Sequence, residues 1–205
     1  MNVGVLASGE GSNLQAILDR LHGREGIAVV AVASDKPDAR ALARARAAGV
    51  PALAFPLGEH AGDRRARDLA IADWLADAGV ELVVLAGYMQ LLDPAFIARF
   101  PQRVVNVHPA LLPAFPGIGS VEQALAYGVK VFGVTVHFVD DGVDTGPIIA
   151  QRPLELPDAT DPQDVRTALR PLEHDLLTDA IRLIARGAVR FDPHNPRRVV
   201  VQRGL

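Results

Sequence analysis

The sequence predicts an α/β fold in which a mostly parallel, twisted sheet is flanked by helices. Through roughly the first hundred residues, short apolar runs alternate with amphipathic stretches, which is the pattern of parallel strands joined by crossover helices. The run at 82–86 is apolar throughout, so we expect a central strand that is buried on both faces. A glycine-rich turn follows the first apolar run, and this predicts a Rossmann-like N-terminal half.

The elements of the N-terminal half follow one another in a regular order. Strands are expected at 3–7, 27–33, 52–55 and 82–86, and helices at 13–21, 39–48 and 64–78. Gly49 and Gly79 directly follow two of these helices, at the position where the left-handed conformation of glycine ends a helix.

The C-terminal half begins with further strands and continues into a long helical stretch. A strand is expected at 103–107, and the alternation of valine and phenylalanine predicts another at 131–139. After a proline-containing loop, Asp161 is expected to cap a helix that reaches about residue 186. Pro171 interrupts this stretch, so we expect the helix to be kinked or split in two.

The domain organisation follows from length and composition. A chain of 205 residues with 49% hydrophobic content can bury a substantial core. We expect a single domain at 1–188, made of halves at 1–100 and 101–188. The short, basic and proline-containing stretch at 189–205 is expected to run over the surface as a tail.

Composition excludes several classes of function. A formal net charge of -3 does not provide the basic field that binding to nucleic acid requires. The absence of cysteine excludes disulfides, thiolate zinc sites, iron–sulfur clusters and a cysteine nucleophile. No basic leader is present, and no apolar run reaches the roughly 20 residues that cross a bilayer. We therefore expect a cytoplasmic protein with no membrane or nucleic-acid partner.

The segment SGEGSNL at 8–14 has the position of a phosphate-binding loop, between the first strand and the first helix. Glycines there allow a tight turn, while Ser12 and Asn13 can cap the helix and donate to phosphate oxygens. A dinucleotide fingerprint with Asp35 as the ribose-binding acid is the competing interpretation, but Leu14 replaces its third glycine. A single phosphate suits the shorter loop better. The glycines could also serve only to make a turn.

An amide, an imidazole and a carboxylate form the candidate catalytic group. Asn106 and His108 are two residues apart on a predicted strand, so their side chains point to the same face. Asp144 lies in a later loop, bracketed by Gly142 and Gly146. In acyl transfer to an amine, the amide would stabilise an oxyanion, the imidazole would relay protons, and the carboxylate would raise the imidazole pKa and fix its orientation.

Two other interpretations of His108 stay open from these residues alone. It could be a structural histidine, or it could bind a metal together with His137 and Asp144, although no local ligand spacing supports a metal. The sequence contains neither a cysteine nor a serine in a nucleophile-elbow context. An acyl group would therefore pass directly from donor to acceptor, without an acyl-enzyme.

Three ordered motifs resemble the folate-dependent formyltransferase family. They are SGEGSNL at 8–14, NVHPALLP at 106–113, and GVTVHFV at 133–139 running on to DTGPII at 144–149. The resemblance extends from about residue 3 to residue 186. It implies the formyltransferase fold, with phosphate binding in the half at 1–100 and catalysis and folate binding in the half at 101–188.

The resemblance also implies a reaction. The amine of glycinamide ribonucleotide would attack the formyl carbon of 10-formyltetrahydrofolate, a co-substrate, and release tetrahydrofolate in purine biosynthesis. By match to the family pattern, Asn106 would stabilise the tetrahedral oxyanion. His108 would act as proton donor and relay, with Asp144 raising its pKa. No metal is implied, and the partners would be these small molecules, bound by a monomer or homodimer.

The same match assigns the two substrate sites. The ribonucleotide residues are Gly11, Ser12, Asn13, Arg170 and Glu173. The folate residues are Arg64, Met89, Gln90, Leu91, Leu92, Asn106, Asp141 and Val143, of which 89–92 would form an apolar wall beside the reaction centre. The chain departs from the family pattern at Ala110, Gly119, Ser120 and the pair Arg170-Pro171, and none of these positions carries a catalytic group.

Three alternatives remain at this point. A formyltetrahydrofolate hydrolase would resemble this domain but carry an extra N-terminal domain, for which a loop beginning at residue 8 leaves no room. A formyltransferase acting on another phosphorylated amine would keep the same residues. A silent nucleotide-binding module would not need Asn106, His108 and Asp144 together.

Overall fold

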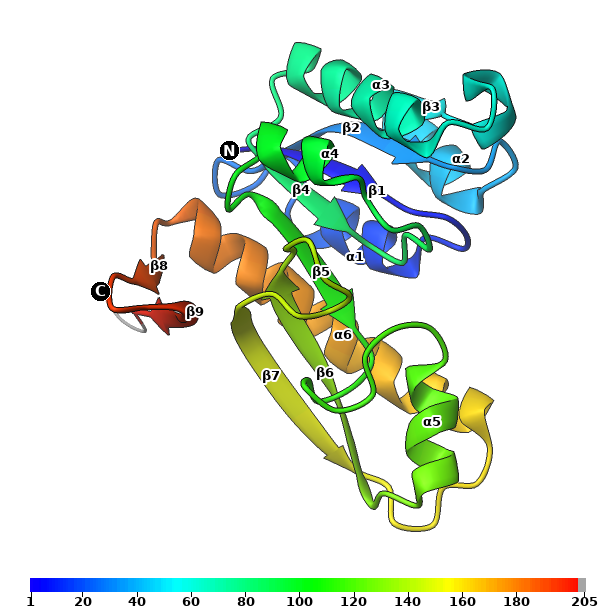
Figure 1. The fold of residues 1–205 in the computed structure, drawn as a ribbon, viewed down its shortest axis with the longest axis vertical. Helices are drawn as coiled ribbons and strands as arrows, with labels where there is room; N and C mark the ends of the chain where they lie inside the picture. The colour runs from blue at the N-terminus through cyan, green and yellow to red at the C-terminus, as the bar shows by residue number, and fades with distance from the viewer. Residues whose placement is uncertain (203–205) are drawn as a thin grey trace. The chain divides into compact units, whose positions relative to one another are not determined.

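The computed structural model describes residues 1–202, which form two compact units that meet in sequence after Asn106. Each unit is an α/β arrangement (Figure 1). The predicted fold class, a mostly parallel central sheet flanked by helices, is confirmed. None of the described helices is both long and apolar enough to cross a membrane.

The first unit is a parallel sheet with the strand order β3-β2-β1-β4-β5. Its strands are β1 (Asn2–Leu6), β2 (Ala28–Ser34), β3 (Ala52–Ala54), β4 (Leu82–Leu85) and the beginning of β5 (Val104–His108). Every residue of β4 is buried, as predicted for a central strand whose side chains face the core on both sides.

Helices cover this sheet on both faces. They are α1 (Ser12–Arg20), α2 (Arg40–Ala47), α3 (Arg64–Asp77) and α4 (Pro94–Arg99), with a short 3-10 helix η1 (Leu57–His60) before α3. The helix α1 packs against α2, and α3 packs against α4. In Figure 1, α3 and α4 lie across the strands from α1. Each predicted element of this half is present, with its ends within one residue of the prediction, and the short helices η1 and α4 are additional.

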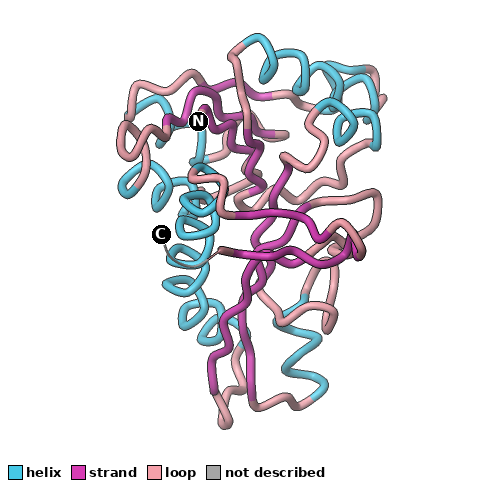
Figure 2. Tube along the Cα trace, turned by 90° about the vertical axis from the view of Figure 1, so that its left-hand side faces the viewer, coloured by secondary structure: helices cyan, strands magenta, loops and turns pink. Residues whose placement is uncertain are grey.

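The second unit is built on a long antiparallel pair of strands. Its elements are the end of β5, α5 (Ser120–Tyr127), β6 (Val131–Phe138), β7 (Ile148–Glu155), α6 (Pro162–Ala185), β8 (Val189–Asp192) and β9 (Asn195–Val201). β6 pairs with β7 over nearly its whole length, and α6 packs against both strands (Figure 2). A buried row of α6 that includes Val165, Leu169 and Leu177 supplies the apolar face.

The helix α6 begins as predicted and is not split in two at Pro171. Asp161 caps it as expected, because its carboxylate accepts the N–H groups of Gln163 and Asp164. The helix is nevertheless a single element of 24 residues that contains Pro171. A proline costs the helix one hydrogen bond, and packing of the apolar face against the sheet offsets this cost.

The C-terminal stretch lies on the surface as predicted, since none of its described residues is buried, but it contains two strands that were not predicted. β8 and β9 form an antiparallel hairpin, and β9 meets β7 at the pair Ile148 and Arg198. The ring of Phe191 packs on that of Phe138, with centroids 4.8 Å apart. The hairpin is therefore part of the second unit. Residues 203–205 of the predicted tail lie outside the described residues.

Candidate active site

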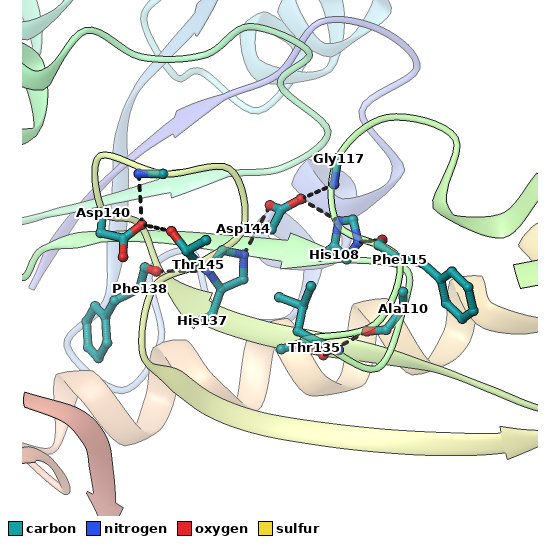
Figure 3. Close-up of polar contacts among 12 residues, drawn as sticks. His108, Ala110, Phe115, Gly117, Thr135, His137, Phe138, Asp140, Asp144 and Thr145 are labelled. Carbon is teal, nitrogen blue, oxygen red and sulfur yellow. Dashed lines mark hydrogen bonds and ion pairs between the residues drawn. The ribbon is translucent and has the colours of Figure 1, made fainter. Parts of the chain in front are cut away.

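The carboxylate of Asp144 lies between two buried histidines (Figure 3). His108, the last residue of β5, is 5% exposed, and its Nδ1 lies 3.2 Å from Oδ2 of Asp144. The other ring nitrogen, Nε2, lies 2.8 Å from the carbonyl oxygen of Phe115. On the far side, Nε2 of His137 lies 3.5 Å from Oδ1 of Asp144. The predicted pairing of His108 with Asp144 is thus present, and both carboxylate oxygens face an imidazole.

The loop after β6 is shaped to present this carboxylate. Asp144 has a positive φ of 52°, a strained conformation for a residue with a side chain. The N–H of Gly117 donates to its Oδ2 at 2.7 Å, which holds the side chain in place. A Cβ at Gly146 would collide with the carbonyl oxygen of Phe138, so glycine is required there. The bracketing glycine thus has a steric role in placing Asp144.

Burial and hydrogen bonds set the ionisation of Asp144. Burial, the largest influence, raises its pKa. The hydrogen bonds from His137 and from the N–H of Gly117, together with the nearby His108, outweigh burial and lower the pKa to about 2. Asp144 is therefore a carboxylate at neutral pH.

The pKa of His108 lies below its ordinary value because burial outweighs its polar neighbours. Burial lowers it, whereas Asp144 and the carbonyl of Phe115 raise it, and burial is the stronger influence. The net pKa lies below the ordinary histidine value of 6.5, so the ring is neutral at about pH 7. The carboxylate does raise the imidazole pKa as expected, but sequence alone could not weigh this effect against desolvation. Because both ring nitrogens face acceptor atoms, a proton that arrives on the ring is stabilised.

Asn106 lies on the same strand as His108, two residues earlier. The strand that the prediction required is therefore present, and Asn106 is half-buried within it. Asn106 also takes part in a further interaction in the structure. Its role as an oxyanion donor beside His108 and Asp144 stays a prediction.

The phosphate-loop segment lies between β1 and α1 as predicted, but its cap differs. Gly11, with φ of 73°, is the N-cap of α1, and no side chain caps the helix. The expectation that Ser12 or Asn13 caps the helix is therefore wrong, because both residues already lie inside its first turn. A Cβ at Gly11 would lie 2.8 Å from Cα of Ala41, so the close approach of α2 requires glycine.

Replacing Gly11 with alanine is expected to lower the free energy of unfolding by at least about 1–2 kcal/mol, because a side chain at positive φ is strained and would meet Ala41. Urea unfolding of the variant measures this. Gly9→Ala is the matched control, because a Cβ at Gly9 meets no atom within 4 Å and Gly9 has no positive φ. Equal losses in the two variants would contradict the steric argument.

The predicted folate residues of the first unit lie on and around the segment that links β4 to α4. Nη2 of Arg64 donates to the carbonyl oxygen of Leu91 at 3.0 Å, so these two predicted residues meet. The side chains of Met89 and Leu91 are 57% and 55% exposed, which leaves apolar surface available to a ligand. The N–H of Met89 donates to Oγ of Ser8 at 2.9 Å. This bond joins the segment to the beginning of the phosphate loop.

The remaining predicted site residues belong to the second unit. Asp141 and Val143 are exposed in the loop that carries Asp144. Arg170 is exposed and Glu173 is half-buried on α6, three positions apart and so on neighbouring positions of one helical face. Their contact with a ribonucleotide stays a prediction.

Two contacts of the cluster were absent from the sequence prediction: the carbonyl of Phe115 and the N–H of Gly117. From the sequence, His137 is grouped with His108 and Asp144 as a possible metal ligand. Its Nδ1 lies 2.8 Å from the carbonyl oxygen of Phe138, and its Nε2 faces Asp144, so it serves both the core and the cluster. Among the described residues, no group of three or more histidine, cysteine, aspartate or glutamate side chains could hold a metal ion.

A buried imidazole–carboxylate pair is an arrangement that can carry out proton transfer. The chain matches the formyl transferase family over residues 1–181 and belongs to that family. It is 46% identical over 181 residues to a phosphoribosylglycinamide formyltransferase of Mycobacterium tuberculosis, covering 88% of this chain and 83% of that protein.

Solved structures agree with this assignment. The crystal structure of glycinamide ribonucleotide transformylase 1 from Symbiobacterium toebii matches with a TM-score of 0.94 and 46% identity, covering 99% of this chain and 94% of that one. A formyltetrahydrofolate deformylase from Pseudomonas syringae matches with a TM-score of 0.89 and 27% identity. The match covers 98% of this chain but 66% of the deformylase. The transformylase from Symbiobacterium toebii is therefore more similar to this chain than the deformylase, in both sequence and structure.

Proposed function

We propose that this chain transfers the formyl group of 10-formyltetrahydrofolate to the amine of glycinamide ribonucleotide, in purine biosynthesis. The products are formylglycinamide ribonucleotide and tetrahydrofolate. The observation that carries the proposal is the buried His108–Asp144 pair, at 3.2 Å, in a chain whose relatives are named for this transfer. The higher identity to these transferases than to the deformylase favours transfer to an amine over hydrolysis.

The chemistry follows from the charges of the pair. The substrate amine attacks the formyl carbon, and the carbonyl electrons move to oxygen, where the amide of Asn106 donates to the oxyanion. His108, neutral at about pH 7, accepts the proton that the amine loses. Asp144, ionised because its pKa is about 2, stabilises the imidazolium. The ring returns the proton to N10 of the folate as the carbon–nitrogen bond breaks, and tetrahydrofolate leaves.

The proposal assigns the other residues to the two substrates. The ribonucleotide phosphate binds the N–H groups at the beginning of α1, where the helix dipole favours an anion. The ribonucleotide residues are Gly11, Ser12, Asn13, Arg170 and Glu173, and the folate residues are Arg64, Met89, Gln90, Leu91, Leu92, Asn106, Asp141 and Val143. The protein acts in the cytoplasm as a monomer or homodimer, without a metal and without nucleic-acid or membrane partners.

Release of tetrahydrofolate from the 10-formyl donor, followed spectroscopically with and without glycinamide ribonucleotide, tests the proposal. We expect release that depends on the ribonucleotide and yields the formylated product. Release at the same rate without any acceptor would identify a hydrolase, and another phosphorylated amine that serves better would change the acceptor. No release under any of these conditions would leave the fold with a binding role and overturn the proposal.

A further inference from the structure

A buried ion pair in the first unit has no part in the proposed chemistry. Arg67 and Asp68, in the first turns of α3, have side chains that are 1% and 0% exposed. Nε and Nη2 of Arg67 both donate to Oδ1 of Asp68, at 2.9 and 2.8 Å. Removing two charges from water costs as much free energy as the pair regains, or more. Stability alone is therefore a weak reason for this pair.

The remaining polar atoms of the pair bind the segment between β4 and α4. Oδ2 of Asp68 accepts the N–H of Asp93 at 2.8 Å. Nη1 of Arg67 donates to Oε1 of Gln90 at 3.4 Å, and Nε2 of Gln90 donates to Oδ2 of Asp35 at 3.1 Å. A continuous chain of hydrogen bonds thus runs from Asp93 through the buried pair to Asp35, and it holds the segment at two points.

The segment held in this way presents apolar side chains outward. Met89 and Leu91 are more than half exposed, whereas Gln90 between them is only partly exposed and is tethered at both ends of its amide. The N–H of Met89 and the carbonyl of Leu91 are also bonded, to Ser8 and Arg64. An apolar surface that is already fixed before the ligand arrives loses little further conformational entropy on binding, so the ligand binds more tightly.

We propose that Arg67 is a positioning residue for folate binding. Together with Asp68, it fixes Gln90 and Asp93 so that Met89 and Leu91 form a preordered apolar surface for the folate co-substrate. Arg67 itself is too deeply buried to contact a ligand. This inference rests on the proposed function, and it predicts that the ion pair affects folate binding without affecting the ribonucleotide.

Arg67→Lys tests the inference. Lysine keeps the positive charge but lacks the planar guanidinium group that donates to both Asp68 and Gln90. We expect the KM for the 10-formyl donor to rise about tenfold, while the KM for the ribonucleotide and kcat change less than about twofold. Equal rises in both KM values, or a loss of thermal stability with no change in the donor KM, would overturn the inference. Arg99→Met, which breaks the exposed pair with Asp73 in the same unit, should change neither KM.

A second variant covers the case in which Arg67→Lys fails to fold. Asp35→Ala removes the other end of the tether and leaves the buried pair intact, so the donor KM should rise about threefold. Asp35→Asn keeps an oxygen that can accept from Gln90 and should restore the donor KM. In the double variant Arg67→Lys/Asp35→Ala, the effects should be less than additive, because both act through Gln90. Fully additive effects would contradict the inference that Arg67 and Asp35 both act through Gln90.

Equilibrium binding of tetrahydrofolate, measured by fluorescence titration, separates this inference from the proposed function. The dissociation constant should rise about tenfold in Arg67→Lys. If wild type binds tetrahydrofolate but transfers no formyl group, the proposed function fails. The ratio of the dissociation constants of Arg67→Lys and wild type then still tests the inference. If wild type does not bind tetrahydrofolate, the inference fails as well.

Discussion

Replacing His108 with alanine is expected to lower kcat for formyl transfer at least about a hundredfold at neutral pH. In the proposed mechanism the neutral imidazole accepts the amine proton, and the structure buries it between Asp144 and the carbonyl of Phe115. Alanine removes the proton acceptor and leaves the ionised Asp144 beside a small cavity. Substrate binding relies on other residues in the proposal, so both KM values should change much less than kcat.

The measurement is the steady-state rate of tetrahydrofolate release with both substrates saturating, together with a thermal melt to confirm that the variant is folded. His194→Ala is the control, because His194 is an exposed residue in the turn between β8 and β9 and should keep the wild-type rate. A loss of less than about threefold in the His108 variant would remove the proton relay from the proposal.

Much of the fold could be predicted because local chemistry and tertiary structure agree. The apolar run of β4 predicted a buried central strand, and all four of its residues are buried. Asp161 predicted the beginning of α6 through its cap. In both cases the signal lies within a few neighbouring residues, so no knowledge of distant contacts was needed.

The missed elements depend on contacts between residues that are far apart in sequence. β7 contains Pro153, which favoured a loop, yet β7 is stabilised by its long pairing with β6. Pro153 is tolerated because it lies at the far end of β7 from Ile148, the residue that pairs with β9. The hairpin of β8 and β9 likewise depends on β7 and on the ring of Phe138.

The candidate site was predictable in its ionisable side chains and not in its backbone partners. The same-face spacing of Asn106 and His108 and the glycine bracket around Asp144 predicted the candidate group, and the structure pairs His108 with Asp144. The carbonyl of Phe115 and the N–H of Gly117 carry no sequence signal, because every residue has such groups. The degree of burial, which decides the direction of the His108 pKa, is a property of the folded chain.

Asp144→Asn is expected to lower kcat by about tenfold to a hundredfold and to move the acid limb of the pH profile to lower pH. The carboxylate raises the pKa of His108, against the stronger effect of burial. Removing its charge must therefore lower that pKa further. Because the neutral ring is the active form, activity is lost as pH falls through the pKa of His108, and in the variant this loss occurs at a lower pH. The imidazolium also loses its stabilising partner, which reduces the rate at every pH.

The pH dependence of kcat/KM between about pH 5 and pH 8 measures this shift, since kcat/KM reports the free enzyme. Asp140→Asn is the matched control, because it neutralises another carboxylate of the same loop. Its remaining amide oxygen can still accept from Thr145 and from the N–H of Gly142, as Asp140 does, so the acid limb should not move. Activity that is instead lost as pH rises through the pKa of His108, at a lower pH in Asp144→Asn than in wild type, would mean that the protonated ring is the active form. His108 would then begin the cycle as an acid, and Asp144 would have to hold the proton in place before the amine attacks.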